Sequence, residues 1–254
     1  MFYKTIIFFV IIFLSTTVTF SNETIFNGNF VQGGIIIGQN KFAKKVLFDG
    51  KNLQISKDGY FIFGFGRNHV SSSTLKIIKK NKDEIINYDL NIEKTEYKIE
   101  KIDGLPNKMV TPGPEFYKKI KEDRDLIKKS INEKYIVDKF PLKFIKPAEG
   151  RISGIYGSQR ILNGIKKNPH GGLDIAAPAG TPIRATSDGK VFLAAKGLYY
   201  TGNIVIINHG YELQSMYIHM KDINVKKGDL VKITSPLDQN LSFGIPRVNQ
   251  CRIS

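Results

Sequence analysis

The sequence predicts a mainly β protein: a small N-terminal antiparallel β domain, an amphipathic connecting helix and a C-terminal antiparallel β domain. Two observations predict the strands, because short apolar runs recur along most of the chain and glycine-containing turn signals separate them. The helix is predicted by one segment, 114–135, in which apolar residues recur at helical spacing among charged ones. With 254 residues and 41% hydrophobic content, the chain can form one large domain or two small ones.

The N-terminal residues have the layout of a secretory signal peptide. Lys4 is the one charged residue before an unbroken apolar run at 6–14, and Thr19 and Ser21 stand like the −3 and −1 residues of a cleavage site. An uncleaved anchor is the alternative, but the run is shorter than the ~20 residues that span a bilayer. We therefore expect residues 1–21 to be removed on export to the periplasm or cell envelope, and no membrane span in the remainder.

The chain is strongly basic and almost free of cysteine. Its formal net charge is +15, and Cys251 is its only cysteine, so no intramolecular disulfide can form. In an exported protein such a charge suits a polyanionic envelope polymer or an acidic lipid surface. Alternatively, the lysines only keep the surface soluble. Export argues against a nucleic-acid partner.

Residues 22–104 read as the small β domain. Asp49-Gly50 and Asp58-Gly59 stand between apolar runs, which is a strong hairpin signal because the turn requires positive φ. His69 is alone in this domain, and we interpret it as a surface or loop histidine rather than a ligand. The predicted strands are 35–37, 45–48, 53–56 and 60–65.

Residues 105–146 read as a linker and the amphipathic helix. Two prolines and two glycines in 104–113 mark a break between elements, and Pro114 is suited to the first helical position. We expect the helix to pack on a domain or to join two. A basic membrane-surface helix is the alternative, against which the interspersed acidic residues argue. The apolar positions at helical spacing are Phe116, Ile120, Ile127, Ile131 and Tyr135.

Residues 147–254 read as the second β domain, and they contain the residues suited to chemistry. His170 and Asp174 are four apart, so both side chains would leave the same face of an extended strand. Imidazole and carboxylate are both common zinc ligands, so the pair could form part of a zinc site. The alternative is that the two residues form an ordinary hydrogen-bonded pair. The predicted strands are 183–185, 190–195, 203–208 and 213–218.

Two further histidines follow in this domain. On a regular strand Tyr217 and His219 would share a face, so His219 could point into a site while its neighbours pack. A zinc hydrolase needs a group that positions the attacking water, and His219 is the candidate for that role. His209 lies at a predicted strand end before a turn, and we interpret it as structural.

The C-terminal domain resembles the M23 family of zinc peptidases, of the lysostaphin and LytM type. The resemblance implies an antiparallel β catalytic domain that binds Zn²⁺ and cleaves peptide cross-links of peptidoglycan in a groove for stem peptides. By this resemblance His170 and Asp174 are the first two zinc ligands, and His219 is one of two histidines that assist the hydrolytic water. The segments that carry the resemblance are 150–160, 169–182, 188–191, 202–210, 217–220 and 225–231.

The sequence departs from the family pattern after Val231. The family takes its third ligand and second catalytic histidine from a late His-x-His motif, but no histidine follows His219 in this sequence. Asp238 would then stand in the place of the third ligand, where a carboxylate can replace imidazole on zinc. The alternative is that Asp238 is an ordinary turn residue.

Two functional hypotheses follow. The first is an exported zinc metalloendopeptidase that acts on stem peptides, with His170, Asp174 and Asp238 as metal ligands and His219 as the catalytic residue. The second is a catalytically degenerate LytM-like module that binds peptidoglycan or activates other envelope hydrolases. Retention of His170, Asp174 and His219 favours the first hypothesis, and the missing His-x-His motif favours the second.

Overall fold

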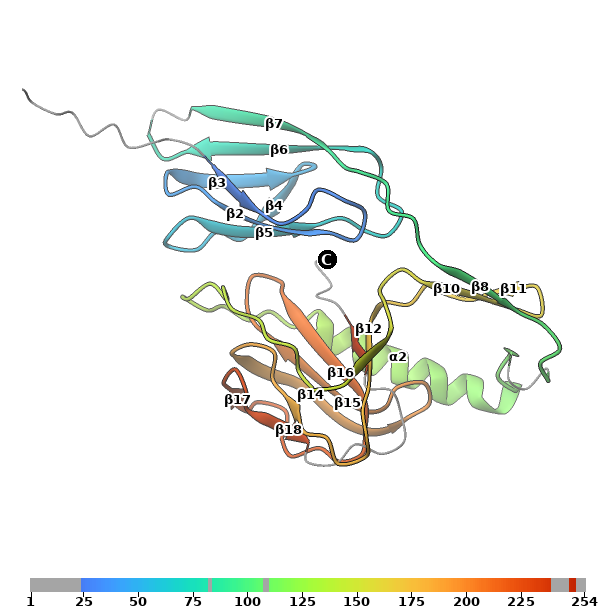
Figure 1. The fold of residues 1–254 in the computed structure, drawn as a ribbon. Helices are drawn as coiled ribbons and strands as arrows, with labels where there is room; N and C mark the ends of the chain where they lie inside the picture. The colour runs from blue at the N-terminus through green and yellow to red at the C-terminus, as the bar shows by residue number, and fades with distance from the viewer. Residues whose placement is uncertain (1–23, 82–83, 107–109, 239–246, 250–254) are drawn as a thin grey trace, which may run out of the picture.

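The structure is a computed structural model, and it describes residues 24–81, 84–106, 110–238 and 247–249. In this part of the chain it is mainly β, with largely antiparallel sheets and one α-helix, which confirms the predicted fold class. Two bodies are visible, one formed by the first strands and one by the last, with the helix beside the second (Figure 1).

The N-terminal body is a sandwich of two sheets over one apolar core. One sheet has the strand order β1-β2-β5 and the other β4-β3-β6-β7. Phe61 and Phe63 from the first sheet and Val46 and Leu75 from the second are buried in this core. The strands are β1 (Ile25–Asn27), β2 (Ile35–Gln39), β3 (Ala43–Phe48), β4 (Lys51–Leu53), β5 (Tyr60–Gly64), β6 (Ser72–Lys79) and β7 (Ile85–Asn91).

The two predicted hairpin turns have different outcomes. Asp49 and Gly50 both have positive φ, 46° and 77°, and join β3 to β4 as an antiparallel hairpin, as predicted. Asp58-Gly59 also forms a turn, with Gly59 at φ 80°, but β4 and β5 lie in different sheets. This second turn therefore passes the chain across the sandwich, and the hairpin prediction is wrong there.

The C-terminal body is built on a seven-stranded antiparallel sheet with the order β17-β14-β15-β16-β19-β12-β9. A two-stranded sheet, β13-β18, is separate from it. The strands are β9 (Arg151–Gly154), β12 (Gly172–Ala176), β13 (Ile183–Arg184), β14 (Gly189–Leu198), β15 (Gly202–Asn208), β16 (Gln214–Met220), β17 (Leu230–Val231), β18 (Pro236–Asp238) and β19 (Arg247–Asn249).

The large sheet has an apolar core on each face. On one face, Ile204, Ile206 and Ile218 pack against Ile127 and Ile131 of the helix. On the other face, the core cluster comprises Ile183, Ala185, Val191, Val205, Ile207, Tyr217, Met220, Val231 and Leu237. The central strands of this sheet therefore carry apolar side chains on both faces.

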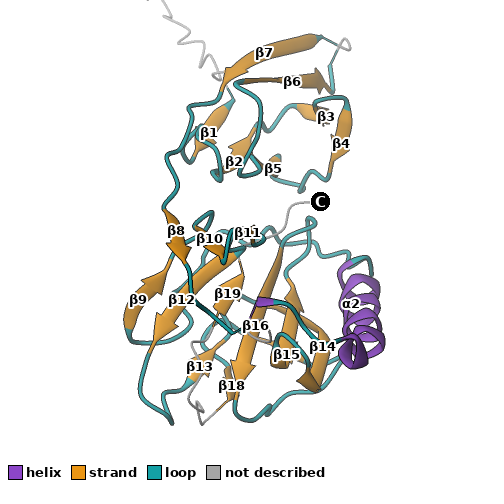
Figure 2. Ribbon diagram, turned by 90° about the vertical axis from the view of Figure 1, so that its right-hand side faces the viewer, coloured by secondary structure: helices purple, strands orange, loops and turns teal. Residues whose placement is uncertain are grey.

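The helix is α2 (Tyr117–Ile131), preceded by one 3-10 turn, η1 (Pro114–Phe116). It lies along one side of the large sheet and contacts β14 (Figure 2). The prediction of an amphipathic helix that packs on a domain is confirmed, but the helix is shorter than predicted: Tyr135 lies beyond its last residue, and Phe116, in the 3-10 turn, is 41% exposed. In the described ranges no helix combines the length and apolarity that crossing a membrane requires.

A three-stranded sheet connects the sequence halves. β8 (Ile99–Ile102) pairs in parallel with β10 (Gln159–Leu162), which in turn pairs with β11 (Ile165–Lys166). The expected domain boundary at residue 104 remains a prediction. However, the strand just before that boundary is hydrogen-bonded to the C-terminal part of the chain.

Candidate metal and catalytic site

His170 lies in the segment before β12 and is held by the turn between β9 and β10. Its backbone N–H donates to the Ser158 carbonyl at 2.7 Å, and its own carbonyl accepts from the Gly157 N–H at 2.8 Å. Its ring Nδ1 lies 3.0 Å from the Ile155 carbonyl. Because a carbonyl can only accept, Nδ1 carries the proton, and the other nitrogen, Nε2, presents a lone pair in the neutral ring.

Asp174 lies on β12 opposite Gly154 of β9. A Cβ at Gly154 would stand 2.5 Å from the Oδ2 atom of Asp174, so only glycine leaves room for this carboxylate. Gly154 is a residue of strand β9 that shapes the site. The sequence signal for this role is the glycine itself, inside an otherwise β-type run.

The structure brings His170 and Asp174 together. Nε2 of His170 lies 3.0 Å from Oδ1 of Asp174, and the two side chains are 13% and 11% exposed. His170 precedes β12 and is not part of that strand. The two side chains therefore meet because the turn between β9 and β10 holds His170 by hydrogen bonds, and not because of strand alternation.

A cation fits between these two atoms. With Nδ1 protonated, Nε2 and Oδ1 are both acceptors that face one another, which is favourable only with a proton or a cation between them. Zinc binds imidazole nitrogen and carboxylate oxygen at about 2.0–2.2 Å, in a tetrahedral arrangement. His170 and Asp174 therefore fit two positions of such a site. Within the described ranges, no group of three or more His, Cys, Asp or Glu residues could together hold a metal ion.

His219 is the extra residue of a β-bulge at the end of β16. Ile218 pairs with Ile204 and Met220 with Asn203, which leaves His219 opposite no residue of its own. Its φ is 59°, a left-handed conformation that costs an L-residue about 1–2 kcal/mol, and its N–H donates to the Thr201 carbonyl at 2.9 Å.

Because of this bulge, the prediction that Tyr217 and His219 share a face of the strand is wrong. Met220, not the residue before it, joins Tyr217 in the core on one face of the sheet. His219 is half-buried at the point where the alternation stops. No turn residue or glycine in the sequence indicates this bulge, so the residue pattern of β16 alone could not have predicted it.

The sheet places His219 two strands away from Asp174. Asp174 and Ile218 both pair with Arg247 of β19, so β12 and β16 are separated by that one strand. Two strand spacings correspond to roughly 10 Å, and His219 directly follows Ile218. The neighbours of Asp174 in its cross-strand row are thus Gly154 and Arg247, neither of which is a zinc ligand.

Asp238 is the last residue of β18, and its backbone pairs with Ile183 of β13. Its side chain lies outside the described part of the structure. Its assignment as the third ligand therefore remains a prediction.

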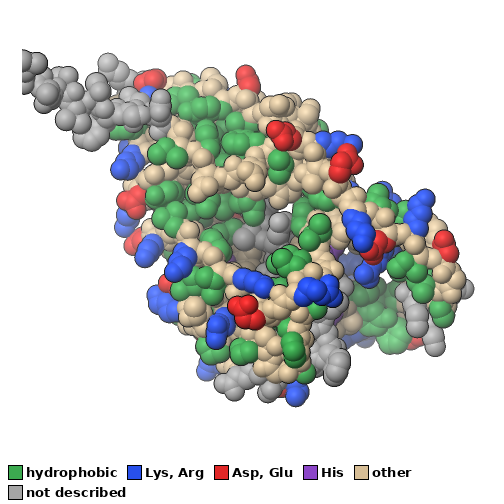
Figure 3. All heavy atoms as spheres, viewed as in Figure 1, with side chains coloured by type: hydrophobic (Ala, Val, Ile, Leu, Met, Phe, Trp, Pro, Cys, Tyr) green, Lys and Arg blue, Asp and Glu red, His purple; other side chains and the backbone are tan. Residues whose placement is uncertain are grey.

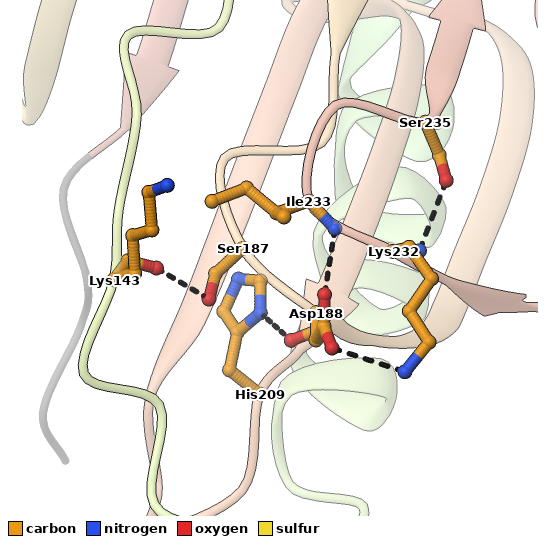
Figure 4. Close-up of polar contacts among 7 residues, drawn as sticks. All are labelled: Lys143, Ser187, Asp188, His209, Lys232, Ile233 and Ser235. Atoms are coloured by element: carbon orange, nitrogen blue, oxygen red, sulfur yellow. Dashed lines mark hydrogen bonds and ion pairs between the residues drawn. The ribbon is translucent and has the colours of Figure 1, made fainter.

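His209 lies at the end of β15, is 2% exposed, and belongs to a polar junction (Figure 4). Its Nδ1 lies 2.6 Å from the Asp188 carbonyl, while the Asp188 carboxylate accepts from the Ile233 N–H at 2.7 Å and from Lys232 at 3.1 Å. The Ile233 hydrogen bond is the main reason that the pKa of Asp188 is lowered. Burial lowers the pKa of His209 from 6.5 to about 4, so its ring is neutral near pH 7.

A cavity of about 730 Å³ lies between the two bodies. From the N-terminal body it is lined by the loop between β1 and β2, and from the C-terminal body by Tyr156, Leu173 and Thr186 among others. Arg67 joins the bodies beside it, donating to the Gly157 carbonyl at 2.6 Å and lying 4.6 Å from the centre of the Tyr97 ring. His170 and Asp174 do not line this cavity.

Comparison with known proteins finds a family match in the part of the chain that contains this site. Residues 168–238 match the sequence model of peptidase family M23, a range that contains His170, Asp174, His219 and Asp238. The resemblance to the M23 family that the sequence indicated is therefore confirmed over this range.

Two relatives and one solved structure illustrate the likeness. The peptidoglycan DD-endopeptidase ShyB of Vibrio cholerae is 45% identical over 64 residues, which are 25% of this chain and 15% of that protein. A lipoprotein NlpD/LppB homolog of Pseudomonas aeruginosa is 35% identical over 102 residues, which are 40% of this chain and 32% of that protein. The crystal structure of a putative peptidase M23 from Pseudomonas aeruginosa has a TM-score of 0.62 and 21% identity, covers 87% of this chain and 88% of that chain, and shows the same fold.

Proposed function

We propose that this chain is an exported zinc metalloendopeptidase that acts on the peptide cross-links of bacterial peptidoglycan. In this proposal His170, Asp174 and Asp238 hold the metal and His219 assists the attacking water. The matched family range and the relative named as a peptidoglycan DD-endopeptidase support the substrate class. The observation that carries the proposal is the 3.0 Å contact between two acceptor atoms, Nε2 of His170 and Oδ1 of Asp174.

The residues of this chain have distinct roles in the proposed reaction. Ile155 fixes the ring of His170 so that Nε2 faces Asp174, and Gly154 leaves space for the Asp174 carboxylate. A bound zinc ion supplies polarisation of the peptide carbonyl and a lower pKa for its water. The imidazole of His219, presented at the bulge, accepts a proton from the attacking water or stabilises the developing negative charge.

The proposed location is the periplasm or cell envelope. The layout of residues 1–21 supports it, although these residues lie outside the described part of the structure. The charge of +15 suits a polyanionic wall, and Lys and Arg side chains occur over both bodies on the face shown in Figure 3. Stem peptides of peptidoglycan are the proposed partner, with other envelope hydrolases as further candidates and no nucleic acid.

Digestion of purified peptidoglycan tests the proposal. Zinc-loaded protein is expected to release shortened stem peptides, detected by mass spectrometry, and His170→Ala to release none. His69→Ala is the matched control, because it also removes a histidine but lies in the N-terminal sandwich. Products that persist with His170→Ala at the wild-type rate would refute the assignment of this site.

A degenerate module that binds peptidoglycan or activates other hydrolases is the second candidate. Two observations favour it: no histidine follows His219 in this sequence, and Arg247 occupies the row position beside Asp174. The NlpD/LppB homolog, moreover, is named as a lipoprotein and not as a peptidase. Co-sedimentation with peptidoglycan that produces no new peptides, even with zinc, would support this function over catalysis.

A further inference from the structure

A buried chain of hydrogen bonds lies on the face of the large sheet opposite α2. It joins Thr186, Asp188, His209, Ser215 and Tyr217, which we call the His209 network. All its side-chain partners are buried: His209 is 2% exposed, Ser215 3% and Tyr217 1%. The proposed reaction uses none of these groups directly.

The chemistry of the atoms fixes the direction of every hydrogen bond in the network. Nδ1 of His209 faces the Asp188 carbonyl at 2.6 Å and must donate, so in the neutral ring Nε2 must accept. The Ser215 hydroxyl, 2.8 Å from Nε2, is then the donor to it. Ser215 has one proton, so at its 3.0 Å contact with the Tyr217 hydroxyl it accepts, and Tyr217 accepts the Thr186 N–H at 2.8 Å.

Both ends of the network are backbone groups of the same short segment, residues 186–188. One end is the N–H of Thr186 and the other is the carbonyl of Asp188, and the side chains between them come from β16 and from the end of β15. Asp188 is in turn fixed by Ile233 through the junction of Figure 4. β16 is therefore tied to the segment before β14 at two points, Ser215 and Tyr217.

These anchors stand directly before the bulge that presents His219. A positive φ at a residue other than glycine persists only where the surrounding structure determines it. Tyr217 fixes β16 from one face, and Ile218 packs into the core on the other, so the strand is held on both sides where the bulge begins. His219 itself is held by the Thr201 carbonyl.

We propose that His209 is a positioning residue which, through Ser215 and Tyr217, fixes the bulge that presents His219 to the substrate. The inference rests on the proposed catalytic role of His219. It assigns to His209 and Ser215 an influence on turnover rather than on metal binding, since His170 and Asp174 are held by a different turn.

The test compares Ser215→Ala with Ser73→Ala in the full-length protein. Both serines are buried, at 3% and 6% exposure, and both lie within hydrogen-bond distance of a histidine Nε2, but Ser73 belongs to the N-terminal sandwich. Ser215→Ala, and likewise Tyr217→Phe, is expected to lower kcat about tenfold or more with KM within about twofold, because small misplacements of a catalytic group are costly. Zinc affinity should not change, and Ser73→Ala should leave kcat unchanged.

A second readout keeps this inference separate from the proposed activity. Backbone chemical shifts of His219 report its positive φ, and they are expected to move in Ser215→Ala and not in Ser73→Ala, whether or not peptidoglycan is cleaved. Imidazole nitrogen shifts should show a neutral His209 protonated at Nδ1. Unchanged His219 shifts and unchanged kcat in Ser215→Ala would overturn the inference, and so would a His209 protonated at Nε2.

Discussion

Removal of the titratable group at His209 should make the C-terminal body less sensitive to acid. The pKa of this ring is lowered by burial from 6.5 to about 4, so the folded chain resists a proton that the unfolded chain accepts. Above pH 6.5 the ring is neutral in both the folded and the unfolded state, and the free energy of unfolding is not reduced by protonation of His209. As the pH falls from 6.5 towards 4, the unfolded state gains the proton first and the free energy of unfolding declines.

The size of this decline follows from the two pKa values. The difference between 6.5 and about 4 corresponds to about 3 kcal/mol once the pH is below both values, of which most is lost by pH 4.5. Burial is the largest influence on the pKa of His209, and it outweighs the hydrogen bond to the Asp188 carbonyl and the Asp188 charge, both of which raise that pKa.

The assay compares wild-type protein with His209→Gln. The glutamine amide has both a donor and an acceptor, as the neutral ring has, but it does not titrate in this range. Urea unfolding at pH 7 and pH 4.5, followed by NMR signals of β15 and β16, should show a loss of stability that is about 2–3 kcal/mol smaller in the variant. Equal losses in the two proteins, or a wild-type His209 that titrates near 6.5, would refute the reasoning.

Three further predictions concern the site and the core. Gly154→Ala should weaken zinc binding about tenfold or more, because the added Cβ displaces the Asp174 carboxylate. Gly66→Ala, where a Cβ meets nothing within 4 Å, should leave zinc binding unchanged. Equal zinc affinities of the two variants in calorimetric titration would contradict this prediction. Arg67→Ala should speed proteolysis between the two bodies, because it removes the hydrogen bond to Gly157 and the contact with Tyr97; equal cleavage rates would oppose this. Ile206→Ala should lower the free energy of unfolding by about 2–5 kcal/mol, and a loss below ~1 kcal/mol in urea would show that the sheet is not packed on both faces as described.

Local patterns in the sequence predicted the elements whose causes are local. The Asp49-Gly50 turn needs positive φ at both positions, and the structure has it. The helical spacing that includes Ile127 and Ile131 predicted the buried face of α2. In both cases the signal and its physical cause lie within a few residues of one another.

Features that depend on distant partners were not predicted. β8 pairs with β10 some sixty residues later, and nothing in residues 99–102 identifies that partner. The bulge at His219 arises from the register between β15 and β16, which strand alternation cannot reveal. For the site, the family resemblance and the spacing indicated the pair His170 and Asp174, but the supporting carbonyl of Ile155 comes from another turn.

Anomalous diffraction at the zinc edge, from crystals of the full-length protein soaked in zinc, tests the central claim most directly. We predict one strong peak within bonding distance of both Nε2 of His170 and Oδ1 of Asp174, and the same map would show whether Asp238 is the third ligand. A map with no peak between His170 and Asp174 at full zinc exposure would contradict the account.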